Sequence, residues 1–325
     1  MNATGSAVRS EGLVDVASWP KLTGALQGLK LLDLGDLPRY KQAVTAGQQI
    51  GWAYYFPSLM TFNRRGRSAI LLGEDSGSIC TYRWTSKEGR QKLEIMVAPA
   101  PMQTEVLRRC IERANDFNSN RSARVMRLDE KDRDSVSAVS GLNISEHKSQ
   151  FLFSPGTYAD LGGRKFRTIR RNVSRVEGLE GLEVQPFSAA YLEPCQELLK
   201  NWGRRHRELH GTRGGVGTSR RALSLTAELS GPDLFGEVVL LRGSLVAYAF
   251  GGEIRPGVGA FFDAKCEIEP PGLSFFHRYS FLSKQRQLEI VNDGSDVGRE
   301  GLRQLKNSLR PVGSHMEYRA TQRID

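Results

Sequence analysis

The segment VNDGSDVGREGLRQLKNSLRP, residues 291–311, concentrates charged side chains that could carry out chemistry. Three cations follow one another at four- and three-residue spacing, which places them along one side of a helix: Arg299, Arg303 and Lys306. Asp296 precedes this helix, and Glu300 lies in its first turn. Two interpretations fit. Asp296 caps a surface helix whose dipole favours Glu300, or the segment forms the floor of an active site.

The elements that must position this segment alternate between helix and strand patterns. Apolar periodicity predicts helices over residues 37–47, 104–117, 190–209, 221–229 and 273–284, with a short charged helix at 129–138. Strand-like runs occupy residues 68–72, 78–84, 92–97, 124–128, 151–153, 182–187, 237–242, 245–254, 259–265, 288–291 and 313–321. This order predicts an α/β (α+β) protein of two mixed domains, with a boundary in residues 140–148.

Composition indicates a basic, water-soluble protein. The 325 residues include 46 Lys and Arg against 36 Asp and Glu, a net charge of +10, which favours a polyanionic partner such as nucleic acid or an anionic membrane surface. Apolar runs are strand-length, too short to cross a bilayer. Since the N-terminus lacks an apolar signal-peptide core and the four cysteines are widely spaced, we expect a cytoplasmic, reduced protein without a metal site.

The positive charge is concentrated in residues 161–176, LGGRKFRTIRRNVSRV, which contain no acid. Helical spacing places four of its arginines on one ridge, opposite an apolar side formed by Phe166, Ile169 and Val173 or Val176. Like charges one turn apart repel, so this ridge favours an anionic ligand over a solvated basic face. The basic residues of this cluster are Arg164, Lys165, Arg167, Arg170, Arg171 and Arg175.

A second basic group surrounds the glycine-rich loop of residues 211–217, and it includes Arg204 and Arg205. The loop could contact a backbone phosphate, although such loops more often only turn the chain. His206 and His210 lie one helical turn apart in the same region, but we interpret them as surface histidines because no third metal ligand is evident.

In these motifs the sequence resembles the C-terminal catalytic domain of bacterial phosphatidylglycerol lysyltransferases and its soluble relatives. The best-matching residues are Asn292, Asp296-Val297-Gly298, Glu300-Gly301-Leu302-Arg303, Lys306 and Pro311. The strand Gly259–Lys265, the basic segment ending near Asn172 and the aromatic residues around Trp52 match more loosely. The resemblance covers most of residues 35–320.

The resemblance implies two tandem GNAT-like domains, each a mostly antiparallel sheet flanked by helices. We expect a flexible segment over residues 1–30, an N-terminal domain over 31–145 and a C-terminal catalytic domain over 146–325, with the basic helix at 161–177. It also implies transfer of an aminoacyl group from aminoacyl-tRNA, without a cofactor. Soluble relatives include the seryl transferase of valanimycin biosynthesis, so we expect a small soluble acceptor of a natural-product pathway.

The resemblance also assigns roles to the charged residues. An aminoacyl ester is already activated, so the enzyme must position it and stabilise charge. We expect Lys306 to stabilise the oxyanion, Arg303 to hold the terminal phosphate or ribose, and Asp296 to hold the ammonium or the acceptor. We expect Asn292, Phe262, Asp263 and Glu300 to contact substrate, and the basic cluster with Arg204 and Arg205 to bind tRNA.

Three alternatives stay open. The acceptor could be phosphatidylglycerol at a membrane surface, or the protein could bind RNA or a membrane without catalysis. The chain could also be an acyl-CoA-dependent N-acyltransferase. The nearest candidate for its pyrophosphate loop, residues 255–260, has the wrong spacing and is better interpreted as a hairpin turn.

Overall fold

The computed structural model describes residues 22–212 and 214–323. Over these residues the strands form one sheet in the order β1-β2-β3-β4-β5-β12-β6-β11-β10-β9-β8-β7. The strands are β1 (Lys30–Leu31), β2 (Ser68–Asp75), β3 (Ser78–Lys87), β4 (Arg90–Ala100), β5 (Arg124–Leu128), β6 (Leu142–Phe153), β7 (Leu182–Pro186), β8 (Phe235–Leu241), β9 (Ser244–Arg255), β10 (Val258–Cys266), β11 (Ile290–Asn292) and β12 (Gly313–Gln322). Most neighbours are antiparallel, which confirms the predicted fold class.

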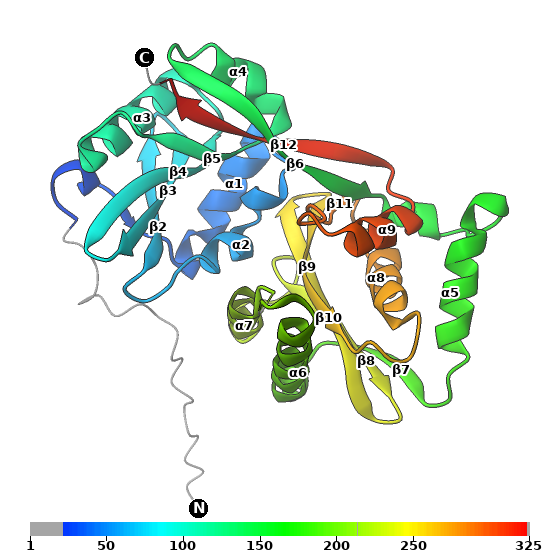
Figure 1. The fold of residues 1–325 in the computed structure, drawn as a ribbon. Coiled ribbons are helices and arrows are strands. Elements are labelled where there is room, and N and C mark those ends of the chain that lie inside the picture. Colours follow the sequence, from blue (N-terminus) through cyan, green and yellow to red (C-terminus); the bar gives the residue numbers. More distant parts are fainter. Residues whose placement is uncertain (1–21, 213, 324–325) are drawn as a thin grey trace, which may run out of the picture.

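Helices cover both faces of this sheet (Figure 1). They are α1 (Leu37–Gly47), α2 (Phe56–Met60), α3 (Thr104–Asn118), α4 (Arg133–Ser137), α5 (Arg167–Glu177), α6 (Leu192–His210), α7 (Val216–Leu225), α8 (Leu273–Lys284) and α9 (Glu300–Ser308). Most agree with the predicted ranges. The predicted helix at 221–229 is shifted, because the chain leaves the glycine-rich loop at Gly215, with φ +84°, and becomes helical at Val216.

The same succession of elements occurs in both halves of the chain. An antiparallel series leads into a strand–helix–parallel strand unit, β4-α3-β5 in the first half and β10-α8-β11 in the second. A last strand then follows in each half, β6 and β12 respectively. These two strands are exchanged: β12 pairs with β5, and β6 pairs with β11. The predicted boundary between residues 145 and 146 lies within β6.

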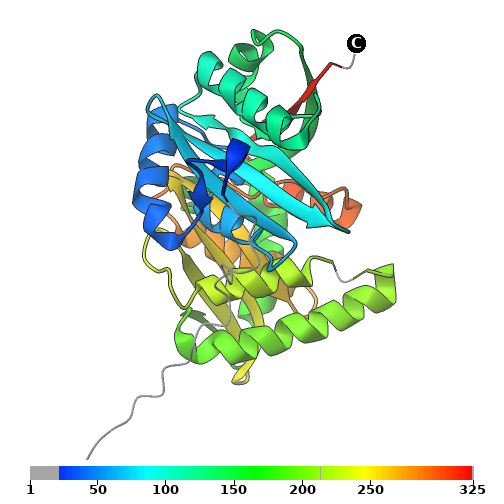
Figure 2. The same cartoon turned by 90° about the vertical axis from the view of Figure 1, so that its left-hand side faces the viewer.

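Each half buries apolar side chains of its own, and a third cluster is shared. Leu107 and Ile111 of α3 pack with β3 and β4, while Ile169 and Val173 of α5 pack with α8. The shared cluster joins α1 and α2 to α6, α7 and β8–β10. Figure 2 shows α6 and α7 side by side on one face of the second-half strands, opposite α8. The apolar side predicted for α5 is confirmed.

Residues 22–30 belong to the predicted N-terminal segment and include a 3₁₀ turn, Gly24–Leu26, with Leu26 and Leu29 buried against α3. The rest of that segment lies outside the described residues. Among the described helices, none is long and apolar enough to span a bilayer.

Candidate active site

The parallel pairing of β10 and β11 ends at Ala260 and Asn292, whereas β10 continues to Cys266. A large open cavity of about 1480 Å³ lies beside this continued stretch of β10. Residues 261–266 form one wall, the C-terminal part of α6 a second, and residues 293–306 a third. Ligands of sheet-based folds commonly bind beyond the carboxyl ends of parallel strands, where the strands diverge. The fold therefore places residues 293–306 at a position where ligands commonly bind.

Aromatic side chains line the cavity beside the turn of residues 293–295. Trp52 donates through Nε1 to the carbonyl of Phe261 at 2.8 Å, and its ring lies 6.1 Å from that of Phe262. The Trp52 backbone N–H donates to Gln150 Oε1 at 3.1 Å. Of the aromatic residues around Trp52, Trp52 itself therefore reaches the cavity, next to Gln150 of β6.

Lys306 lies beneath this turn and is almost completely buried, with 1 % of its side chain exposed. Its ammonium donates to the backbone carbonyls of Asp293, Gly294 at 3.2 Å and Ser295 at 3.0 Å. It also lies 3.4 Å from Asp293 Oδ1. Burial lowers the pKa of Lys306 to about 8. Because an ammonium has three N–H donors, these three carbonyls occupy all of them.

Asp293 ties the same turn to α8. Arg278 Nη1 donates to both carboxylate oxygens of Asp293, at 2.8 and 2.6 Å. The Arg278 guanidinium also lies 4.4 Å from the centre of the Phe261 ring. The turn is therefore fixed from two sides by cations whose charge Asp293 partly compensates.

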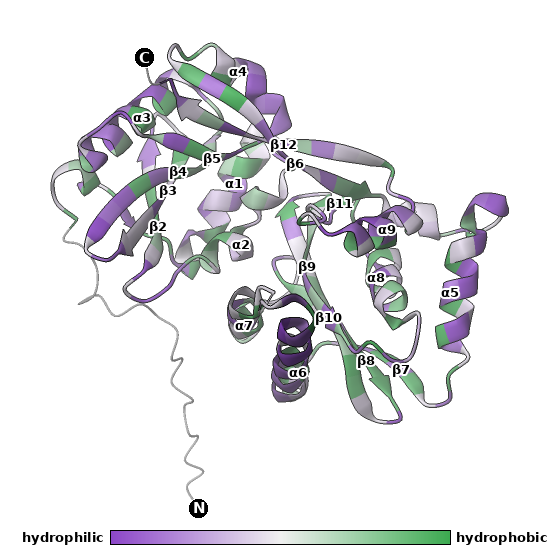
Figure 3. Ribbon diagram, viewed as in Figure 1, coloured by the Kyte–Doolittle hydropathy of each residue, from purple (hydrophilic) through white to green (hydrophobic). Residues whose placement is uncertain are grey.

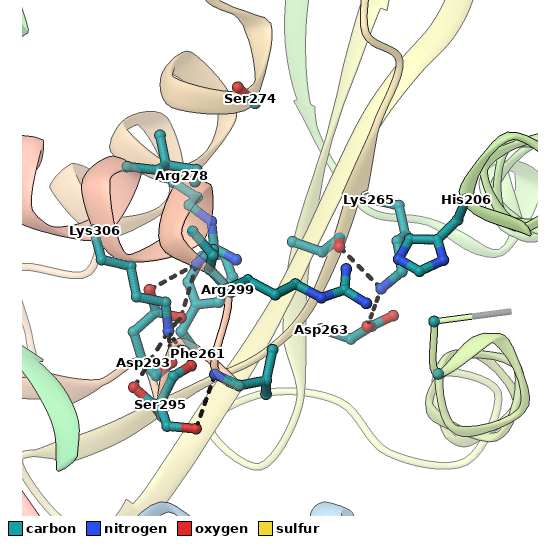
Figure 4. Close-up of a pocket in the computed structure, with 18 of the residues that line it drawn as sticks. His206, Phe261, Asp263, Lys265, Ser274, Arg278, Asp293, Ser295, Arg299 and Lys306 are labelled. Atoms are coloured by element: carbon teal, nitrogen blue, oxygen red, sulfur yellow. Dashed lines mark hydrogen bonds and ion pairs between the residues drawn. The ribbon is translucent and has the colours of Figure 1, made fainter. Parts of the chain in front are cut away.

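Arg299 is the cation of this wall that extends into the cavity. Figure 4 shows its side chain reaching from the start of α9 between the Arg278–Lys306 side and the Asp263–Lys265 side. No carboxylate within residues 22–212 or 214–323 forms an ion pair with it. A positive group in this position is available to an anion or to a carbonyl oxygen that gains charge.

On the opposite wall, Asp263 accepts three hydrogen bonds. Ser219 Oγ and Lys265 Nζ donate to its Oδ1 at 2.8 and 2.7 Å, and Tyr248 Oη donates to its Oδ2 at 3.1 Å. The Lys265 ammonium also lies 5.1 Å from the centre of the Trp202 ring. This pair brings one acid and one cation to the cavity, each about nine-tenths buried.

The interpretation of His206 as a surface histidine is wrong, because only 5 % of the surface of this residue is exposed. The imidazole lies between the rings of Trp202 and His210, 4.7 Å from each, and Nδ1 donates to the carbonyl of Thr212 at 2.7 Å. Gly214 covers the ring: a Cβ at that position would lie 2.7 Å from the imidazole Cε1. The glycine-rich loop thus packs on a histidine of the cavity wall.

The structure brings some of the predicted site residues to the cavity and leaves others away from it. Those that line it are Phe262, Asp263, Glu300, Lys306 and Arg205. Asn292 lies below the cavity wall, where its amide donates to the Ile50 carbonyl and to Gln150 Oε1 and accepts from the Gly294 N–H. It therefore supports the turn from beneath.

Asp296 and Arg303 form an ion pair outside the cavity lining, with Arg303 Nε 2.5 Å from Asp296 Oδ2. Asp296 also accepts from the Gly298 N–H at 2.9 Å, and these two donors lower the pKa of its carboxyl. Arg303 contacts Glu300 as well, at 3.3 Å. Asp296 does not cap α9, because the N-cap residue is Arg299 and no side chain makes a capping hydrogen bond there. Asp296 instead accepts from the turn that precedes the helix and pairs with Arg303.

The basic cluster forms the exposed side of η7 (Arg164–Phe166) and α5, away from the cavity lining. In Figure 3 much of the α5 ribbon has the colour of hydrophilic residues. Within the described part of the chain, no carboxylate forms an ion pair with any of its six cations. Arg170 donates to the carbonyls of Leu161 and Gly163, so it holds the preceding loop. Arg204 donates to Asn201 on the exposed side of α6.

Several cavity residues were not assigned a role from the sequence: Lys148, Lys265, Arg278, Asp293, Arg299 and Glu317. Among these six, only Arg299 could have been recognised from the helical spacing, since it lies in one row with Arg303 and Lys306. The others come from separate elements, and only the sheet topology brings them together.

Comparisons with known proteins agree with the resemblance at the level of fold. No protein-family model and no curated protein matches the sequence. A conserved protein of unknown function from Bacteroides thetaiotaomicron superposes with a TM-score of 0.76 and 20% identity, covering 91% of this chain and 99% of that one. The C-terminal domain (DUF2156) of a proposed lysylphosphatidylglycerol synthetase from Agrobacterium fabrum gives 0.61 and 16%, covering 88% and 93%.

L-PGS from Bacillus licheniformis gives a TM-score of 0.60 and 14% identity, covering 90% of this chain and 93% of that one. Each similarity extends over at least 88% of this chain and 93% of the other, so it includes most of both halves. The chain has the fold of the lysylphosphatidylglycerol synthetase C-terminal domain, as the motif resemblance predicts.

Proposed function

We propose that this protein is an aminoacyltransferase that moves an amino acid from aminoacyl-tRNA to an amine or hydroxyl of a small soluble acceptor in a natural-product pathway. The observation that carries this proposal is the convergence of cations from β10, α8 and the 293–306 segment on one cavity. They are Lys265, Arg278, Arg299 and Lys306. The shared fold with L-PGS supports the same reaction class.

The reaction requires little covalent chemistry from the side chains of the protein. The acceptor nitrogen or oxygen forms a bond to the ester carbonyl carbon, and the bond from that carbon to the terminal ribose oxygen breaks. The proton lost by the nucleophile passes to the ribose oxygen. Negative charge develops on the carbonyl oxygen in between, so positioned cations lower the barrier.

Arg299 and Lys306 would share this task in different ways. The guanidinium of Arg299 extends into the cavity and has no carboxylate partner among the described residues, so it can meet the oxyanion directly. The ammonium of Lys306 holds the turn at Asp293–Ser295, and it can reach an oxyanion only by exchanging one of its carbonyl partners. Both arrangements make the turn and its cations essential for transfer.

The unpaired cations of α5, together with Arg204 and Arg205, would hold the tRNA backbone. Their charges have no described acid to neutralise them apart from Glu267, which pairs with Arg205. Such a surface predicts binding that weakens steeply as the salt concentration rises.

The test is to incubate the purified protein with total aminoacyl-tRNA carrying labelled amino acids, with and without pools of candidate acceptors. Acceptor-dependent loss of label from one tRNA species, and its appearance in a new product, is the expected result. Consumption of acetyl-CoA instead, or salt-dependent RNA binding without turnover, would refute the proposal. Arg299→Gln serves as the matched inactive variant.

A further inference from the structure

One end of the cavity is built by β5, β6 and β12 and is not used by the roles proposed above. It is formed by Arg127, Lys148, Gln150 and Glu317. Glu317 lies directly across the β6–β12 pairing from Lys148. Arg127 Nε lies 3.2 Å from one Glu317 oxygen, and Gln150 Nε2 donates to the other at 3.1 Å. Both oxygens of this buried carboxylate therefore already have partners.

Lys148 has none. Although it is the cross-strand neighbour of Glu317, its ammonium forms no ion pair or hydrogen bond with any group in the described part of the chain. The side chain is half-buried in the cavity wall. Burial, and then the nearby charge of Arg127, lower the pKa of Lys148. A partly desolvated ammonium without a partner is unfavourable unless a ligand supplies one.

The excess of positive charge extends beyond Lys148. Arg319 lies close enough to act on the same carboxylate, and its Nε is buried without a hydrogen-bond partner among the described groups. Three cations thus surround Glu317, while the adjacent His147 is held neutral because burial and Arg127 lower its pKa to about 4. The net charge of this end is positive, and it complements an anion of roughly one or two charges.

The two ends of the cavity differ in exposure. Leu209, Ile268 and Val297 line the cavity with 67, 60 and 57 % of their surface exposed. The side chains of Arg127 and Glu317 at the other end are only 20 and 6 % exposed. A bulky polyanion such as tRNA can reach the exposed mouth, whereas the β5–β6–β12 end suits a small anion.

We propose that the β5–β6–β12 end binds the acid group of the acceptor, a carboxylate or a phosphate, through Lys148 and Arg127. The acceptor is then a small molecule that carries both a nucleophilic amine or hydroxyl and an anionic group. This inference rests on the proposed transfer reaction. It places the acceptor opposite the exposed mouth, so the nucleophile faces the centre of the cavity beside Arg299.

The experiment compares acceptors in matched pairs that differ only in the acid group: an amino acid with its amide, and glycerol 3-phosphate with glycerol. Transfer from labelled aminoacyl-tRNA is measured for the wild type, Lys148→Met and Lys200→Met. Lys200 is an exposed control outside the cavity lining that pairs with Glu197 at 3.2 Å. We expect at least a tenfold higher kcat/KM for the acid-bearing member of the preferred pair.

We further expect Lys148→Met to raise the acceptor KM at least tenfold, with kcat within about threefold and aminoacyl-tRNA affinity unchanged. Lys200→Met should behave as wild type. Equal use of acid-free acceptors, or an unchanged KM in Lys148→Met, overturns the inference. A loss of tRNA affinity in Lys148→Met also overturns it, because the site would then hold the nucleic acid. Preference for phosphatidylglycerol vesicles over glycerol 3-phosphate would keep the anion site but reject a soluble acceptor.

A binding measurement separates this inference from the proposed function. Inorganic phosphate should raise the melting temperature of the wild type and of Lys200→Met but not that of Lys148→Met. If this difference is found while no aminoacyl-tRNA is consumed with any acceptor, the reaction is wrong and the anion site stands. If aminoacyl-tRNA is consumed and phosphate stabilises all three proteins equally, the site is wrong and the reaction stands.

Discussion

Replacing Lys306 by methionine tests the centre of the candidate site. Methionine keeps the unbranched shape of the side chain, one atom shorter, and removes the three donors. The carbonyl of Gly294 keeps a partner, the Phe151 N–H at 3.0 Å, but the carbonyls of Asp293 and Ser295 lose theirs. Two unsatisfied carbonyls cost about 1–3 kcal/mol each. The charge penalty behind the lowered pKa of Lys306, about 3 kcal/mol, disappears at the same time.

These opposing effects leave a net loss of about 1 kcal/mol, which is smaller than the usual stability of a folded protein. The variant should therefore stay folded, with a melting temperature lower by roughly 3 °C. Transfer should fall much further. Loss of an oxyanion donor, or of the turn that aligns the cations, costs about 3 kcal/mol of transition-state stabilisation, or a factor of at least one hundred in kcat.

The assay is single-turnover transfer of labelled amino acid at saturating aminoacyl-tRNA, with melting measured on the same samples. Arg303→Met is the matched control, because Arg303 lies on the same helix in an exposed ion pair that solvent screens. Its kcat should stay within about threefold of wild type. The affinity of Lys306→Met for tRNA should also be unchanged, since the ammonium is buried. Near-normal transfer by folded Lys306→Met would refute both roles of this lysine.

Three further outcomes follow from the geometry. Arg299→Gln should lower kcat at least about a hundredfold without changing the melting temperature, because its guanidinium holds no described acid; an activity within threefold would remove Arg299 from the site. Neutralising Arg164, Arg167 and Arg171 together should reduce the slope of log Kd for tRNA against log salt by about 2; an unchanged slope would place the tRNA elsewhere. Burial raises the pKa of Glu317 from 4.5 to about 7, so the folded state keeps a proton that the unfolded chain loses, and stability falls with pH across this window. In urea titrations at several pH values, the free energy of unfolding of the wild type should fall by up to about 3 kcal/mol across this window, and that of Glu317→Gln should not. The same pH dependence in variant and wild type would contradict the role of Glu317.

Apolar periodicity predicted most of the elements because their buried faces are continuous. Val106, Leu107, Cys110, Ile111 and Ala114 give α3 one apolar side, and they are buried as expected. β6 is the exception. Its residues 142–150 are mostly polar and half-exposed, since this strand is held by its pairing with β12 rather than by apolar burial. A local pattern therefore could not distinguish it from a linker.

The candidate site was predictable only in part for a related reason. The motif of residues 291–311 predicted the turn and helix α9 beside the end of a strand. It therefore identified Lys306 and Glu300, which line the cavity. Spacing alone could not tell which side of α9 faces the cavity. Arg303 turns toward Asp296 outside the cavity lining, while Arg299, at the N-cap of α9, turns inward. Lys148 and Glu317 are 169 residues apart, and only the register of two exchanged strands makes them neighbours.

The exchange of β6 and β12 explains how the first half contributes to a site whose motifs lie in the second. Because β6 pairs with β11, it brings Gln150 beneath the 293–295 turn, where Gln150 Oε1 accepts from Asn292 and from the Trp52 N–H. Because β12 pairs with β5, Glu317 lies beside Arg127. The same pairing that joins the halves thus sets the chemistry of the inner end of the cavity. In the proposed reaction, the reacting centre would depend on motifs within one half, whereas the choice of acceptor would depend on residues from both.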